Sequence, residues 1–180
     1  QFSVMTTKKR TIKSTRGTIY DRNGNILASN RLSYSLTLED NGSYETMRQK
    51  NLTLNSVAYH LLQILESNND APDRDFHIIL DDAENYVFDT ETEITINRFR
   101  ADIYGRALIE DMEDSEKNAT PEEMMEYLLG EERFSVVLTG EKEYTDEELE
   151  KYGLPHELSR QELLDIAIIR YTLSTNSFKK

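Results

Sequence analysis

The alternation of apolar and polar residues predicts β-structure in the first forty residues. Two short apolar runs, residues 18–20 and 26–28, flank Asn23-Gly24. This pair favours a type I′ turn because both residues tolerate positive φ, so we expect a hairpin here. In residues 31–39 every second position is apolar, which indicates a half-buried strand before the turn-forming residues 40–43.

Helical periodicity becomes dominant after residue 43. Apolar residues at helical spacing predict a helix over residues 53–67, and alternation over 76–88 predicts a second hairpin. Residues 92–104 are ambiguous, since Ile94-Thr95-Ile96 favours a strand. The capping-box pattern of Thr90 with Glu93, and Phe99 with Ile103 at i,i+4 spacing, lead us to predict a helix.

Three later helices have clear start signals. Thr120-Pro121-Glu122-Glu123 predicts a helix that buries Met124, Met125, Leu128 and Leu129 and stops at Gly130. Ser159 and Glu162 form a second capping box, for a helix that reaches about residue 174 and carries Leu163, Ile166, Ala167, Arg170 and Tyr171. Thr145-Asp146-Glu147-Glu148 starts a shorter helix before Gly153. The paired acids in these turns are interpreted as helix caps because carboxylates favour helix N-termini.

These elements predict an α+β fold in two parts. The first, residues 1–43, is a β arm with the hairpin. The second, residues 44–180, is a compact head of about four helices with a small β-hairpin, and its apolar content is sufficient for a real core.

The charge of the chain differs between these parts. Residues 1–38 hold seven basic side chains and the single acid Asp21, a net charge of +6, whereas the whole chain carries −13. The remainder is therefore at −19. A basic arm could contact anionic lipid or the acidic part of the protein itself, but the acidic part would be repelled by phosphates, so nucleic acid is not expected as a partner.

Several kinds of site are disfavoured by the sequence. There is no cysteine, the three histidines do not lie at metal-ligand spacing, and no apolar run is long enough to span a bilayer. No signal peptide is visible, and because the chain opens with Gln we expect a fragment whose leader or anchor is missing. We expect no cofactor.

The stretch RGTIYDRNGNILA, residues 16–28, also begins like a calcium loop at Asp21. An EF-hand loop needs Gly at its sixth position and Glu at its twelfth, where this chain has Ile26 and Leu32. The glycine spacing matches neither phosphate-binding motif. The local chemistry therefore predicts a turn.

The same stretch closely resembles the first motif of the N-terminal, non-catalytic module of class B penicillin-binding proteins, R-G-x-I-x-D-R-x-G-x-x-L-A. The matching residues are Arg16, Gly17, Ile19, Asp21, Arg22, Gly24, Leu27 and Ala28. The patterns at 99–105, 118–128 and 169–180 more weakly resemble the head of some Gram-positive members. The resemblance implies that Arg16, Gly17, Asp21, Arg22 and Gly24 have a structural role, in which the charged residues pair with later motifs of the family; the alternative is a solvated turn.

The chemistry of this family is carried by another domain, whose S-x-x-K serine is acylated. Ser177-Phe178-Lys179-Lys180 fits this pattern formally, but no K-[TS]-G follows and the large α/β domain is absent, so the chain is not expected to be an enzyme. Its implied parent is a serine-type peptidoglycan D,D-transpeptidase, held at the extracytoplasmic face of the membrane by an N-terminal helix not included here.

The resemblance thus implies a pedestal that positions the absent transpeptidase domain. Its implied partners are that domain, a membrane-embedded glycan polymerase, other cell-wall synthesis proteins and a second copy in a homodimer. Two alternatives remain from other classes. An independent extracellular binding module with an acidic head for a cationic ligand would need an apolar pocket, and a carboxylate-based hydrolase would need a strongly perturbed carboxyl group in a cleft.

Overall fold

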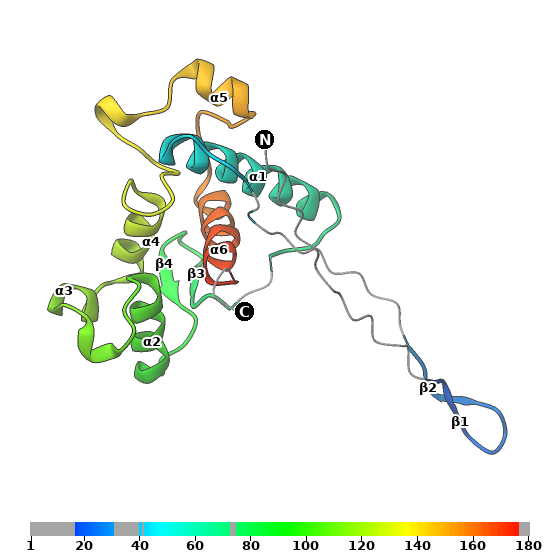
Figure 1. The fold of residues 1–180 in the computed structure, drawn as a ribbon. Helices are drawn as coiled ribbons and strands as arrows, with labels where there is room; N and C mark the ends of the chain where they lie inside the picture. The colour runs from blue at the N-terminus through cyan, green and yellow to red at the C-terminus, as the bar shows by residue number, and fades with distance from the viewer. Residues whose placement is uncertain (1–16, 31–39, 41, 73–74, 177–180) are drawn as a thin grey trace, which may run out of the picture. The chain divides into compact units, whose positions relative to one another are not determined.

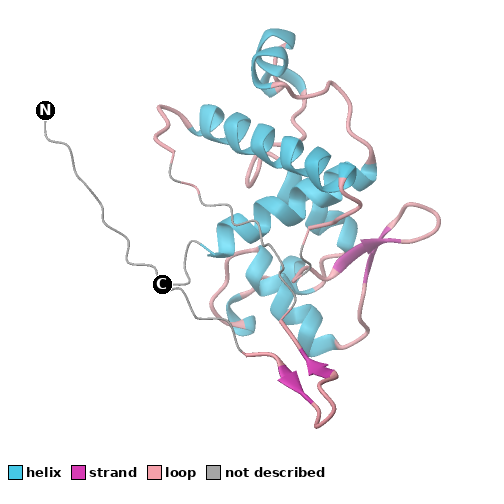
Figure 2. Ribbon diagram, turned by 90° about the vertical axis from the view of Figure 1, so that its right-hand side faces the viewer, coloured by secondary structure: helices cyan, strands magenta, loops and turns pink. Residues whose placement is uncertain are grey.

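The computed structural model describes residues 17–30, 40, 42–72 and 75–176. The chain divides into an N-terminal unit, residues 1–37, and a helical unit, residues 38–180, which are described separately here. Two small β-hairpins and a mostly helical second unit make the fold α+β, as the sequence predicts (Figures 1 and 2).

The described part of the N-terminal unit forms an antiparallel hairpin of β1 (Ile19–Tyr20) and β2 (Ile26–Ala28). Ile19 pairs with Ala28 and Tyr20 pairs with Ile26, so the register shifts between the two pairs. The predicted hairpin is therefore confirmed. The strand predicted over residues 31–39 lies outside the described residues.

The helical unit opens with α1 (Met47–Ser67), which begins six residues before the predicted start. The earlier start has a local cause. The Thr46 side chain accepts a hydrogen bond from the Gln49 N–H at 3.1 Å, and the Gln49 amide oxygen accepts one from the Glu45 N–H at 2.8 Å. Thr46 with Gln49 is thus an N-terminal capping pair that the apolar periodicity alone does not reveal.

A second hairpin follows α1, with β3 (Ile78–Leu80) and β4 (Tyr86–Phe88) in antiparallel register. β4 packs against α4 (Pro121–Leu129). Because Ile78 and Tyr86 are buried while the hairpin turn is exposed, one side of this small sheet contributes to the core of the unit.

The ambiguous segment forms the helix α2 (Glu93–Ile103), but the predicted cap is wrong. The N-cap residue is Thr92, and its N–H donates to the Thr90 hydroxyl at 3.2 Å, so Thr90 supports the turn before the helix. The short helices η1 (Ile109–Asp111) and α3 (Asp114–Lys117) follow; the sequence does not predict them.

The remaining helices confirm their start signals. α4, α5 (Asp146–Tyr152) and α6 (Arg160–Asn176) begin at capping boxes of Thr120, Thr145 and Ser159 with the glutamates three residues later. A 3₁₀ turn, η2 (Gly140–Lys142), lies between α4 and α5. Gly153 ends α5 with a φ of +64°, which few other residues adopt easily.

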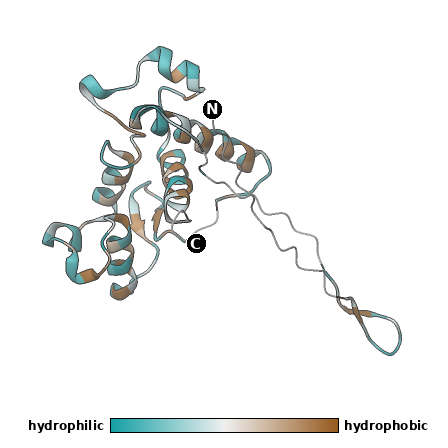
Figure 3. Cartoon of the chain, in the orientation of Figure 1, coloured by the Kyte–Doolittle hydropathy of each residue, from teal (hydrophilic) through white to brown (hydrophobic). Residues whose placement is uncertain are grey.

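The core of the helical unit is organised around α6, which packs against α1 and α4 (Figure 1). All residues from Leu164 to Tyr171 are buried, so α6 has no solvated face over these two turns. Four residues predicted for α4, Met124, Met125, Leu128 and Leu129, are buried in the same cluster. Hydrophilic residues dominate α3 and the segment from η2 to α5 (Figure 3).

Candidate functional site

The turn of the first hairpin has a defined geometry that differs from the predicted one. The Gly24 N–H donates to the Asp21 carbonyl at 3.1 Å, and the Asp21 N–H donates to the Asn25 carbonyl at 2.9 Å. Gly24 has a φ of +83°, whereas Asn23 keeps a negative φ. The loop is therefore a type I turn closed by a left-handed glycine, so the type I′ prediction is wrong.

Asp21 caps this turn with its carboxylate. One carboxylate oxygen accepts the N–H groups of Asn23 and Asn25, both at 2.8 Å, and the other accepts the Asn25 side-chain amide at 2.8 Å. These hydrogen bonds lower the pKa of Asp21, and the bond from the Asn25 side chain has the largest effect. Asp21 thus has a structural role in the turn. Among the described residues, no group of three His, Asp or Glu side chains gathers as a metal site.

Of the other predicted motif residues, the structure places Gly24 in the same turn as Asp21. Arg16 lies outside the described residues. Arg22 is exposed, and a Cβ atom added to Gly17 would meet nothing within 4 Å. Their pairing with further motifs of the family stays a prediction.

The hairpin also exposes its apolar side chains. Exposed fractions run from 57% for Tyr20 to 67% for Leu27, with Ile19 and Ile26 between them. Among the described residues the sheet has only these two strands, and a hairpin with exposed apolar residues is suited to pairing with further chain.

The same turn occurs a second time, at the tip of β3 and β4. The Asp81 carboxylate accepts the N–H groups of Ala83 and Asn85 at 2.9 and 2.8 Å, and the Asn85 side-chain amide contacts both of its oxygens. The fourth residue, Glu84, has a φ of +61°, in the place of Gly24. The shared sequence signal is Asp and Asn four residues apart.

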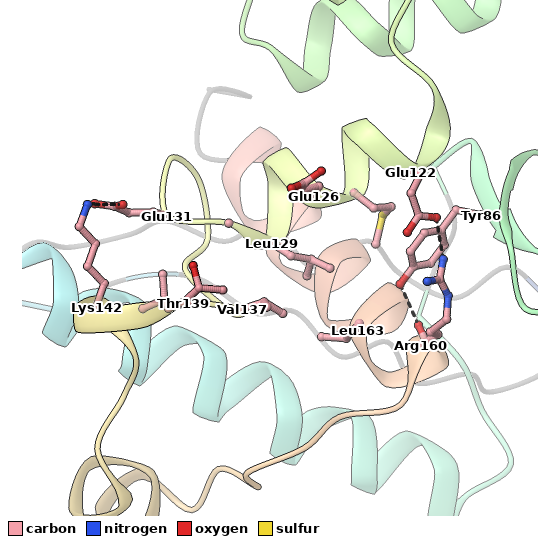
Figure 4. Close-up of a pocket in the computed structure, with 13 residues that line it drawn as sticks. Tyr86, Glu122, Glu126, Leu129, Glu131, Val137, Thr139, Lys142, Arg160 and Leu163 are labelled. Carbon is pink, nitrogen blue, oxygen red and sulfur yellow. Dashed lines mark hydrogen bonds and ion pairs between the residues drawn. The ribbon is translucent and has the colours of Figure 1, made fainter.

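The helical unit carries a groove that the sequence does not predict (Figure 4). Its volume is about 370 Å³, and its walls come from β4, α4, the start of α6 and residues 137–142. At one end the Tyr86 hydroxyl donates to the Arg160 carbonyl at 3.2 Å, while the Arg160 guanidinium lies 4.2 Å from the centre of the Tyr86 ring. Arg160 also pairs with Glu122 at 2.7 Å.

The opposite end of this groove is closed by a second ion pair, Lys142 with Glu131 at 2.6 Å. Apolar side chains of Leu129, Val137 and Leu163 lie between the two charged ends, as Figure 4 shows. The arrangement is an apolar floor between polar ends, which is typical of a binding groove.

The groove just described is the first of two hollows. The second, of about 610 Å³, borders it and shares Val137, Leu138 and Leu163 with it. The two hollows thus lie on either side of one segment, and together they are called the acidic groove. Six carboxylates belong to its lining: Glu122, Glu126, Glu131, Glu143, Asp146 and Glu157.

The segment between the two hollows is fixed by hydrogen bonds to the rest of the helical unit. The N–H groups of Val136 and Val137 both donate to the Leu129 carbonyl, at 2.7 and 2.9 Å. Ser135, with a φ of +49°, accepts a hydrogen bond on its carbonyl from the Tyr144 hydroxyl at 2.7 Å. The loop after α4 is therefore fixed at its strained residue.

A buried polar network completes this support. The Arg170 guanidinium, whose pKa burial lowers to about 10, donates to the Asn51 amide oxygen at 2.9 Å. Asn51 in turn donates to the Ser135 hydroxyl at 3.0 Å, and Asn55 donates to the carbonyls of Phe134 and Ser135. α1 and α6 thereby fix the loop that separates the two hollows.

Arg48, on α1, fixes the position of α5. Its guanidinium makes a two-pronged contact with Glu148, at 2.8 and 2.6 Å, and donates to the carbonyls of Lys142 and Glu143. The hydrogen bond from Arg48, followed by that from the Thr145 N–H, lowers the pKa of Glu148 to about 2. One side chain thus connects α1, α5 and the wall of the acidic groove.

Ser177 lies outside the described residues. Desolvation raises the pKa of the Asp102 carboxyl group on α2, and this residue lines neither hollow. Glu123 and Glu148 cap their helices, as predicted, whereas Glu122 forms an ion pair with Arg160 that the sequence does not predict.

Comparison with known protein families gives the class of the chain. The model of the family "Penicillin-binding Protein dimerisation domain" matches residues 11–167, most of the chain. The chain therefore belongs to the penicillin-binding protein dimerisation domain family, a non-catalytic domain. Neither the curated proteins nor the solved structures give a match. Among the described residues, no helix has both the length and the apolar character of a membrane span.

Proposed function

We propose that this chain is the pedestal of a class B penicillin-binding protein, acting at the extracytoplasmic face of the membrane. In this role it positions a transpeptidase domain that lies outside the chain. The parent enzyme would be a serine-type peptidoglycan D,D-transpeptidase, held by an N-terminal membrane helix. The observation that carries the proposal is the family match together with the motif at residues 16–28.

The first hairpin is the element that we assign to this positioning role. Its turn is capped internally by Asp21, so the loop has a fixed shape, while its apolar side chains remain exposed. Arg16 and Arg22 would then pair with later motifs of the parent chain. The helical unit is the part that faces cell-wall synthesis partners, among them a membrane-embedded glycan polymerase and, in a homodimer, a second copy.

Labelling with a fluorescent β-lactam tests the proposal. The chain alone should not be acylated, because it lacks an assembled nucleophile, lysine and K-[TS]-G strand. The parent protein should be labelled stoichiometrically. Covalent labelling of the chain alone, or a parent gene that encodes no transpeptidase domain after this segment, would refute the proposed function.

The positioning role has its own test in the parent protein. Arg22→Ala should lower the thermal stability of the transpeptidase domain or the rate of its acylation, while Arg98→Ala, on an exposed turn of α2, serves as the control. Equal behaviour of both variants and the wild type would mean that Arg22 only flanks a solvated turn.

A further inference from the structure

We propose that the acidic groove of the helical unit binds a basic peptide segment with apolar side chains, supplied by another protein. The groove consists of the two hollows on either side of Val137 and Leu138. This inference deepens the partner contacts of the proposed function, but it concerns the helical unit alone and does not depend on a transpeptidase domain.

The apolar floor of the groove explains why the ligand must carry apolar side chains. Leu129 and Leu163 line it, and Val137 between the hollows is 47% exposed. The two volumes, about 370 and 610 Å³, are of the size that receives large anchoring side chains or a small ligand. An apolar segment that covers Val137 would remove this surface from water.

The charge of the rim explains why the ligand must be basic. The two cations in the lining, Lys142 and Arg160, are already paired with Glu131 and Glu122. Within the described residues, the other acids of the lining, Glu126, Glu143, Asp146 and Glu157, form no ion pair with a lysine or arginine side chain. Lysines or arginines that flank the apolar residues of a ligand would complement this excess of negative charge.

The groove is also preformed, which favours binding. The Leu129 carbonyl and the Tyr144 hydroxyl hold the segment around Val137, and Arg48 holds α5 on the far side. A rigid receptor loses little conformational entropy when a ligand binds, so even a short segment can bind measurably.

The test uses the full chain and a defined probe, an amphipathic peptide built from leucine and lysine. A leucine–glutamate peptide of opposite charge is the negative control. Binding is measured by calorimetry at low and high salt. The decisive variants are Val137→Asp, in the groove, and Val57→Asp, at an exposed position of α1 outside the groove. Both add the same negative charge to the chain.

The groove predicts opposite outcomes for these two variants. Val137→Asp should weaken binding of the leucine–lysine peptide roughly tenfold or more, because it places a charge in the apolar floor. Val57→Asp should leave the affinity unchanged within about twofold. If the basic peptide were attracted only by the overall acidity of the protein, both variants would bind it with the same affinity as each other, equal to or slightly higher than that of the wild type. That result would overturn the proposal.

A second pair of variants tests the rim. Glu126→Gln with Glu157→Gln should weaken binding several-fold and reduce its salt dependence, whereas Glu66→Gln with Glu91→Gln, exposed acids elsewhere, should not. Equal effects of the two double variants would contradict the assigned site. Concentration-dependent dimerisation that Val137→Asp abolishes would show that a second copy occupies the groove, and would overturn the proposed occupant.

Discussion

Replacing Glu84 by glycine should stabilise the helical unit, because this residue occupies a backbone conformation that disfavours a side chain. The two hairpin turns share their geometry, and their fourth residues, Gly24 and Glu84, have φ values of +83° and +61°. The Glu84 side chain is exposed. The first turn therefore serves as an internal reference for the second.

The magnitude follows from two opposing contributions. A non-glycine residue in the left-handed region costs about 1–2 kcal/mol. Glycine offsets part of this gain, since it has more conformational freedom in the unfolded chain, at a cost of about 0.5–1 kcal/mol. We expect Glu84→Gly to raise the free energy of unfolding by about 0.5–1 kcal/mol, which corresponds to a melting temperature higher by roughly 1–4 °C for a domain of this size.

Urea denaturation followed by far-UV circular dichroism measures this change, since the signal reports on the helices. Glu84→Gln is the matched control, because it removes the charge near Arg160 but keeps the backbone restriction. An equal gain in the two variants would assign the effect to charge. An unchanged free energy of unfolding in Glu84→Gly would refute the strain argument itself. The reciprocal substitution, Gly24→Ala, should weaken the first hairpin.

Three further predictions concern other contacts. Arg48→Met should destabilise the helical unit by about 1–3 kcal/mol and raise hydrogen exchange in α5, because the contact with Glu148 and two carbonyls is lost; unchanged exchange would refute this. The depressed pKa of Glu148 stabilises the fold above about pH 4.5, by about 1 kcal/mol after solvent screening. This contribution should disappear as the pH falls towards 2, and Glu148→Gln should flatten that part of the acid-unfolding curve. Residues 19–28 should exchange much faster than residues 160–174 in dilute protein, and equal protection in a proven monomer would place the hairpin in the core of the helical unit.

Local signals account for the elements that the sequence predicts well. The boxes at Thr120, Thr145 and Ser159 satisfy free N–H groups with side chains three residues away, so no distant contact is needed to start those helices. The first hairpin is likewise specified locally. Its turn type is also set locally, but not by Asn23-Gly24 alone: this pair is compatible with two loop lengths, and the cap from Asp21 selects the longer one.

Where two local signals compete, packing decides between them. Thr90 and Thr92 can both cap α2, and the helix begins after Thr92, with Phe99 and Ile103 placed in the core. α1 begins at the local cap of Thr46, earlier than its apolar periodicity suggests, and its first turns bury Asn51 and Asn55 against the loop at Ser135. Buried amides of this kind cannot be told from surface residues without their partners.

By itself, the sequence determined the α+β class, the hairpin motif, the capped helices and the acidic character of the second part. These features depend on residues within a few positions of one another, and the family motif is likewise contiguous. Only the tertiary structure decided that residues 164–171 of α6 are all buried, that Arg170 lies inside the protein, and that Val137 separates two hollows. The reason is physical: each of these features requires α1, α4 and α6 to approach one another, and contacts between residues far apart in the chain are not encoded by any local pattern.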